Sequence, residues 1–124
     1  MELWHNPRCS KSRAAKQLLD ERGVDYVERR YLDDVPTVDQ LNAVLTALGR
    51  DPWEIARLAE PIARELGMAD WPREGPDARG RWIAALVEHP ILIERPIVIA
   101  DDGRAALGRP TEAITALIDA TAAR

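Results

Sequence analysis

One cysteine, no phenylalanine and no long apolar run characterise this chain of 124 residues. Its single cysteine, Cys9, has no partner for a disulfide within the chain, so we expect a fold that needs no oxidising compartment. No apolar stretch approaches the roughly 20 residues that span a bilayer. The first residues also lack the basic lead and apolar run of a secretion signal. We therefore expect a cytoplasmic protein with no membrane partner.

Strong positive charge is also missing, since the formal net charge is −4. This balance argues against a protein that binds nucleic acid by neutralising its phosphates. A local group of arginines can still bind a small anion. The length and the hydrophobic share of 46% suffice for one domain with a real core, and no repeat or linker interrupts the chain. We predict a single domain over residues 1–124.

The N-terminal part predicts a strand, a helix and a second strand. Residues 2–4 precede a turn at 5–7, and apolar residues at helical spacing follow from Ser10 up to a natural stop at Gly23. Residues 25–30 then alternate as in a strand. A strand, helix and strand within about 30 residues predict a right-handed crossover and a parallel pair.

The middle of the chain is predicted to be helical. Thr37 and Gln40 have the spacing of a capping box, and an apolar stripe follows as far as Gly49. Proline in Asp51-Pro52 favours the start of another helix, which continues in broken form to residue 67. Residues 71–80 are the least regular segment of the sequence, and we expect them to form a surface loop. Helical spacing returns over 81–88 and ends at His89-Pro90.

The C-terminal part predicts a hairpin and a last helix. From residue 91 the chain has an extended run, a strand, a turn at 101–103 and a second strand. Pro96 has no N–H for a ladder and must stand at a strand's beginning or edge. A helix follows Pro110. The whole order predicts an α/β, thioredoxin-like fold (β-α-β … β-β-α, mixed sheet) with an inserted helical subdomain over about 37–88.

Cys9 is the candidate reactive group. At the N-terminus of a helix, free N–H groups and the helix dipole favour a thiolate, and Arg8, Lys11 and Arg13 add positive charge. The alternative is a small buried apolar side chain. The polar neighbours of Cys9 favour the reactive interpretation.

Three chemistries compete for a reactive Cys9. A dithiol motif needs C-x-x-C, but Ser12 occupies the last position. A cysteine phosphatase usually has C-x5-R, whereas Arg13 stands four residues after Cys9. A zinc site needs three or four ligands, and only Cys9, His5 and His89 exist beyond carboxylates, so we expect no metal. What remains is a single nucleophilic thiolate that a thiol from another molecule must regenerate.

Four segments carry a resemblance over nearly the whole chain: HNPRCSKSR, RLAEPIARELG, HPILIERPIV and GRPTEAI. Together they closely resemble the glutaredoxin-coupled arsenate reductases of the ArsC family. The resemblance implies a thioredoxin-like fold with an inserted helical subdomain, in agreement with the order of elements above. It also implies reduction of arsenate to arsenite with no bound cofactor and with glutathione, or an equivalent thiol, as co-substrate.

The resemblance implies a role for each matching residue. Cys9 would attack arsenate and form a covalent thiol–arsenic adduct, which glutathione attacks and glutaredoxin finally resolves. His5 would help to activate the thiol, and Ser12 would lie beside it. The oxyanion would be held by three arginines, and a cis peptide is expected at the Arg95-Pro96 bond. These arginines are Arg57, Arg95 and Arg109.

Other interpretations stay open. Arg57 could be a surface charge, Arg109 a charge at a helix start, and His5 the cap of a turn. The chain could be a thiol-dependent oxidoreductase of the same family that acts on another substrate. It could also be a non-catalytic, redox-linked transcription regulator, although such regulators usually carry C-x-x-C, which Ser12 interrupts.

Overall fold

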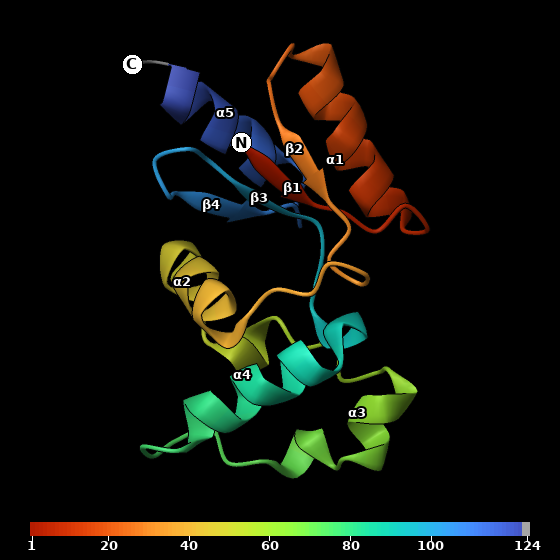
Figure 1. Ribbon diagram of the computed structural model, residues 1–124, viewed down its shortest axis with the longest axis vertical. Helices are drawn as coiled ribbons and strands as arrows, with labels where there is room; N and C mark the ends of the chain where they lie inside the picture. The colour runs from red at the N-terminus through yellow and green to blue at the C-terminus, as the bar shows by residue number, and fades with distance from the viewer. Residues whose placement is uncertain (123–124) are drawn as a thin grey trace. The chain divides into compact units, whose positions relative to one another are not determined.

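The computed structural model describes residues 1–122, in two compact units (Figure 1). The first, which we call the sheet unit, comprises Met1–Asp34 and the chain from Arg95 onward. The second, the helical unit, comprises Val35–Glu94. Within the described residues, no helix is both long and apolar enough to cross a membrane.

A four-stranded sheet with the order β2-β1-β3-β4 forms the sheet unit. The first strand pairs in parallel with the second and antiparallel with the third, which forms a hairpin with the fourth. The predicted parallel pair and the predicted hairpin are therefore confirmed. The strands are β1 (Glu2–Trp4), β2 (Val27–Arg29), β3 (Ile97–Ile99) and β4 (Ala105–Leu107).

The second strand is shorter than the predicted 25–30. Its ladder begins where the N–H of Val27 donates to the carbonyl of Met1, at 2.9 Å. The register runs from Val27 opposite Glu2 to Arg29 opposite Trp4, so β2 has the same length as its partner strand β1.

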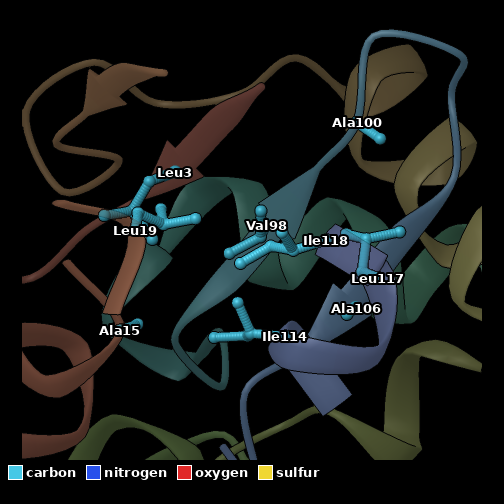
Figure 2. Packing of buried hydrophobic residues seen from close by; sticks show 9 residues of the cluster. All are labelled: Leu3, Ala15, Leu19, Val98, Ala100, Ala106, Ile114, Leu117 and Ile118. Atoms are coloured by element: carbon cyan, nitrogen blue, oxygen red, sulfur yellow. The ribbon is translucent and has the colours of Figure 1, made fainter. Parts of the chain in front are cut away.

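Two helices cover one face of this sheet, α1 (Ser10–Glu21) and α5 (Glu112–Ala122). Leu3, Val98 and Ala106 stand side by side in register and point to that face. Figure 2 shows their side chains gathered with those of the two helices. Full burial of a leucine or isoleucine contributes about 1.5–3 kcal/mol, so this cluster holds α1 and α5 against the sheet. The helix residues of the cluster are Ala15, Leu19, Ile114, Leu117 and Ile118.

The helical unit is built around the buried Trp82, whose ring meets Trp53 and Trp71 edge-on at centroid distances of 6.1 and 5.5 Å. The predicted capping box is present, because Thr37 and Gln40 exchange hydrogen bonds at the start of the first helix. The α-helices are α2 (Val38–Leu48), α3 (Pro61–Glu65) and α4 (Ala78–Glu88); the 3₁₀ turns are η1 (Pro52–Glu54), η2 (Met68–Asp70) and η3 (Pro90–Leu92).

Three predictions in the helical unit were wrong. The helix expected at Asp51-Pro52 is a single 3₁₀ turn. Helix α4 begins at Ala78 and not at residue 81, since Ala78 is buried and Arg79 bonds to Asn42 and Asp51 at 3.1 and 3.2 Å. The extended run expected from residue 91 begins as the turn η3, which is closed by the Leu92 N–H on the carbonyl of His89.

Candidate active site

The loop between β1 and α1 is held in shape by Asn6. Its carbonyl accepts the N–H of Cys9, and its side-chain oxygen accepts the N–H of Arg8, both at 3.0 Å. Its own N–H donates to the hydroxyl of Ser12, again at 3.0 Å. These bonds place Cys9 as the N-cap of α1, with extended backbone angles. The predicted position of the thiol at a helix N-terminus is confirmed.

The thiol of Cys9 lies in a largely buried but polar setting, with the residue 7% exposed. Burial raises the pKa of Cys9. The backbone N–H groups of Ser12 and Lys11, followed by the charge and a hydrogen bond of Arg95, outweigh burial and bring this pKa below its ordinary value. These surroundings therefore favour a thiolate over an inert buried thiol.

Arg95 and Arg109 meet beside this sulfur. Arg95 stands just before β3 and Arg109 just after β4, so pairing of these strands brings the two residues together. The Nε of Arg109 donates to the carbonyl of Arg95 at 2.8 Å, and its Nη2 lies 3.9 Å from the Sγ of Cys9. Two cations that converge on one sulfur create a place suited to an anion.

Each of these arginines precedes a proline through a cis peptide bond. The cis bond at Arg95-Pro96 agrees with what the resemblance implied. A second cis bond, Arg109-Pro110, was not predicted from the sequence.

Gly108 allows the close approach that seats Arg109. Its N–H donates to the carbonyl of Pro96 at 2.8 Å. A Cβ at this position would lie 2.7 Å from both the Cγ of Pro96 and the Cδ1 of Ile114. The ring of Pro96 can move its Cγ only by a change of pucker, and the side chain of Ile114 crowds the same position.

We therefore expect Gly108→Ala to lower the free energy of unfolding by about 1–3 kcal/mol, the usual cost of overpacking. Urea denaturation measures the change. The matched control is Gly80→Ala, since Gly80 lies in α4 with open space around its position. That variant should be neutral or more stable by up to about 1 kcal/mol. Equal stability of the Gly108 variant and the unsubstituted protein would refute the tight fit.

His5 and Ser12 form a buried pair behind the loop. The Nδ1 of His5 lies 3.1 Å from the Ser12 hydroxyl, which also accepts the N–H of Asn6. Burial, with smaller contributions from Lys16 and other cations, lowers the pKa of His5 despite the opposing charge of Glu28. We therefore assign a neutral ring that carries its proton on Nε2, with Ser12 donating to Nδ1. This pair supports the loop, and the N–H of Ser12 acts on the Cys9 thiol.

Arg57 belongs to the helical unit, where it follows the isolated bridge between Ala56 and Ile93 and is not part of a helix. Its Nη1 lies 2.8 Å from a carboxylate oxygen of Glu60, and its Nε lies 3.8 Å from one of Glu94. Both partners lie in the same unit. A role for Arg57 in the site stays a prediction from the resemblance.

The roles of Asn6 and Gly108 in shaping the site were not predicted. The predicted turn at 5–7 includes Asn6, but its hydrogen bonds to Cys9, Arg8 and Ser12 were not anticipated. Nothing local to Gly108 indicates how closely Pro96 approaches. Among residues 1–122, no group of three or more histidine, cysteine, aspartate or glutamate residues is arranged to hold a metal ion.

Comparison with known proteins identifies the family and the fold of the chain. The model of the ArsC family matches residues 4–117. A Streptomyces viridochromogenes protein described as an uncharacterized protein in the glnII region is 55% identical over 92% of this chain and 95% of its own length. An arsenate reductase of Neisseria meningitidis serogroup A is 43% identical over 95% of this chain and 97% of its own.

The fold has a solved counterpart in an arsenate reductase from Vibrio cholerae, with a TM-score of 0.81, 36% identity, and coverage of 93% of this chain and 96% of that one. The family model, the relatives and the solved structure each match most of the length of this chain. The chain belongs to the ArsC family and has its thioredoxin-like fold.

Proposed function

We propose that the protein is an arsenate reductase of the cytoplasm, with Cys9 as its nucleophile and with glutathione and glutaredoxin as electron donors. The observation that carries the proposal is the Cys9 thiol, set at the N-terminus of α1 beside Arg95 and Arg109. The arsenate reductase from Neisseria meningitidis, which covers almost the full chain, supports the choice of substrate.

In the first step, the thiolate of Cys9 attacks the arsenic of arsenate. A sulfur–arsenic bond forms, and one arsenic–oxygen bond breaks as that oxygen takes up protons and leaves as water. The remaining oxygens carry negative charge. Planar guanidinium groups at Arg95 and Arg109 suit such an oxyanion better than a point charge would, and the resemblance adds Arg57 as a third.

In the second step, the thiol of glutathione replaces another arsenic-bound oxygen, which also leaves as water. The two sulfurs then join, the arsenic keeps the electron pair, and arsenic(III) departs and takes up water as arsenite. Cys9 is left as a mixed disulfide with glutathione. A glutaredoxin thiol removes the glutathione and restores Cys9, so two thiol electrons reach each arsenate and one net water forms. The lone cysteine of the chain fits such an external donor.

His5 and Ser12 act in this proposal by holding the loop. Their buried hydrogen bond, with that from Asn6 to Ser12, keeps the N–H groups of α1 directed at the thiolate. His5 thereby supports ionisation of Cys9 through Ser12.

A coupled turnover assay tests the function. The protein is mixed with arsenate, glutathione, glutaredoxin and a system that reports glutathione disulfide, and each component is left out in turn. We expect arsenite only when the protein, arsenate and glutathione are all present, with a faster rate when glutaredoxin is added. A mixed disulfide of glutathione replaces arsenate in a parallel assay. Turnover of that disulfide without turnover of arsenate would contradict arsenate as the substrate.

A further inference from the structure

A hollow of about 370 Å³ lies within the sheet unit, beside the loop that carries Cys9. One wall is the loop itself, including Pro7 and Arg8, and the other is the segment after β2, including Arg30, Leu32 and Asp33. Its volume lies in the range of small-molecule sites. No step of the proposed arsenate reduction uses this hollow.

The hollow presents charges of both signs around an apolar patch from Pro7 and Leu32. Within residues 1–122, neither the Arg8 guanidinium nor the Asp33 carboxylate forms an ion pair. Both side chains belong to exposed residues and are available to a ligand.

Arg30, on the wall after β2, adds a second cation to the hollow. Its Nε lies 3.0 Å from a carboxylate oxygen of Glu28, while Lys16 lies 2.9 Å from the other oxygen. Two cations therefore share one carboxylate, and this group keeps a net positive charge. The hollow thus offers two guanidinium groups and one carboxylate.

We infer that this hollow binds the thiol donor, a small peptide-like thiol that carries an ammonium group and carboxylates. Such a molecule is a zwitterion at neutral pH, because free α-carboxyl and α-amino groups titrate near 3.5 and 8. Its carboxylates match Arg8 and Arg30 by charge-assisted hydrogen bonds, and its ammonium group matches Asp33. The inference rests on the proposed function, and it names the class and the place of the donor.

The hollow adjoins the loop residue that directly precedes the reactive cysteine. Arg8 lines the hollow and directly precedes Cys9, so their Cα atoms are about 3.8 Å apart. A tripeptide spans about 10 Å when extended. A donor held by its ends in the hollow can therefore bring its thiol around the loop to the arsenic on Cys9.

The test uses S-methylglutathione, which has the charges of the donor and no reactive thiol. We expect Arg30→Ala to weaken its binding about tenfold, as titration of backbone NMR shifts measures, and Asp33→Asn to weaken it to a similar degree. The matched control is Arg104→Ala. Arg104 is likewise exposed and likewise pairs with a carboxylate two residues earlier, Asp102, but lies outside the hollow.

Turnover supplies the second measurement. With glutathione as donor, Arg30→Ala should raise the KM for the thiol about tenfold and leave the KM for arsenate unchanged. With 2-mercaptoethanol, which is uncharged, the same variant should match the unsubstituted protein. Recovery of part of the binding in Arg30→Lys would show that charge is the feature recognised.

The outcomes separate the two proposals. Unchanged binding of S-methylglutathione in Arg30→Ala and Asp33→Asn, or equal weakening in Arg104→Ala, would overturn the site in the hollow. Absence of arsenate turnover together with the expected binding pattern would contradict the proposed function and leave the thiol site standing. Binding requires no arsenate chemistry, so each result bears on one proposal alone.

Discussion

Cys9→Ser is expected to lower arsenate-dependent oxidation of glutathione by more than about a thousandfold, to the rate without protein. A serine hydroxyl does not ionise near neutral pH, and it forms no sulfur bond through which two electrons can pass to arsenic. The chain has no other cysteine that could take over. The measurement is the rate of arsenite release in the complete assay.

The control for this variant is Ser10→Ala, a change at the exposed residue next to Cys9. It should keep most of the activity. Far-UV circular dichroism and the melting temperature of the Cys9 variant should match those of the unsubstituted protein within a few degrees, since the two side chains are nearly the same size. Substantial turnover by the folded Cys9→Ser protein would remove Cys9 from the chemistry.

Arg95→Ala is expected to lower kcat/KM for arsenate by about 10²–10³, the usual loss when one group that stabilises developing charge is removed. In the proposed reaction Arg95 acts on both partners, because its charge lowers the pKa of Cys9 and the resemblance assigns its guanidinium to the oxyanion. Its loss should also raise the pKa of the thiol. The effect should exceed that of Arg109→Ala, because Arg109 is exposed and touches the sulfur only at 3.9 Å.

The comparison variant is Arg95→Lys, which keeps the charge and loses the planar fork. In this variant we expect the pKa of Cys9 to stay low, while the rate of arsenate turnover falls. Steady-state kinetics with arsenate varied, then with glutathione varied, assign the loss to one substrate. Unchanged kcat/KM for arsenate in Arg95→Ala, with the fold intact, would exclude Arg95 from the site.

Signals local in sequence predicted much of the sheet unit. The position of Cys9 followed from the polar, basic residues around a helix start, and the hairpin followed from Asp-Asp-Gly between two apolar runs. The capping box at Thr37 could be predicted in the same way. Each of these features depends on residues within a few positions of one another, and the sequence displays such relations directly.

Features set by distant contacts were not predictable in this way. Helix α4 begins early because Arg79 bonds to Asn42 and Asp51, far away along the chain. Gly108 is required by the ring of Pro96 and the side chain of Ile114. The hollow beside Cys9 joins a loop before α1 to a segment after β2, and no spacing in the sequence indicates that their charges face one space.

The lowered pKa of Cys9 has a consequence for stability. Since the folded state releases the thiol proton at a lower pH than the unfolded state, stability should rise with pH between the two pKa values. The thiolate stabilises the folded state fully at a pH above the pKa of the unfolded state. This stabilisation disappears as the pH falls through the pKa of the folded state.

Alkylation of Cys9 by iodoacetamide as a function of pH measures the ionisation of this thiol most directly. The rate follows the thiolate fraction, and the single cysteine gives one unambiguous signal. We expect a midpoint in the folded protein below that of a free thiol, about 8.5, and a return to about that value in urea. A midpoint in the folded protein equal to or above the one in urea would contradict a thiolate held by the α1 amides and Arg95.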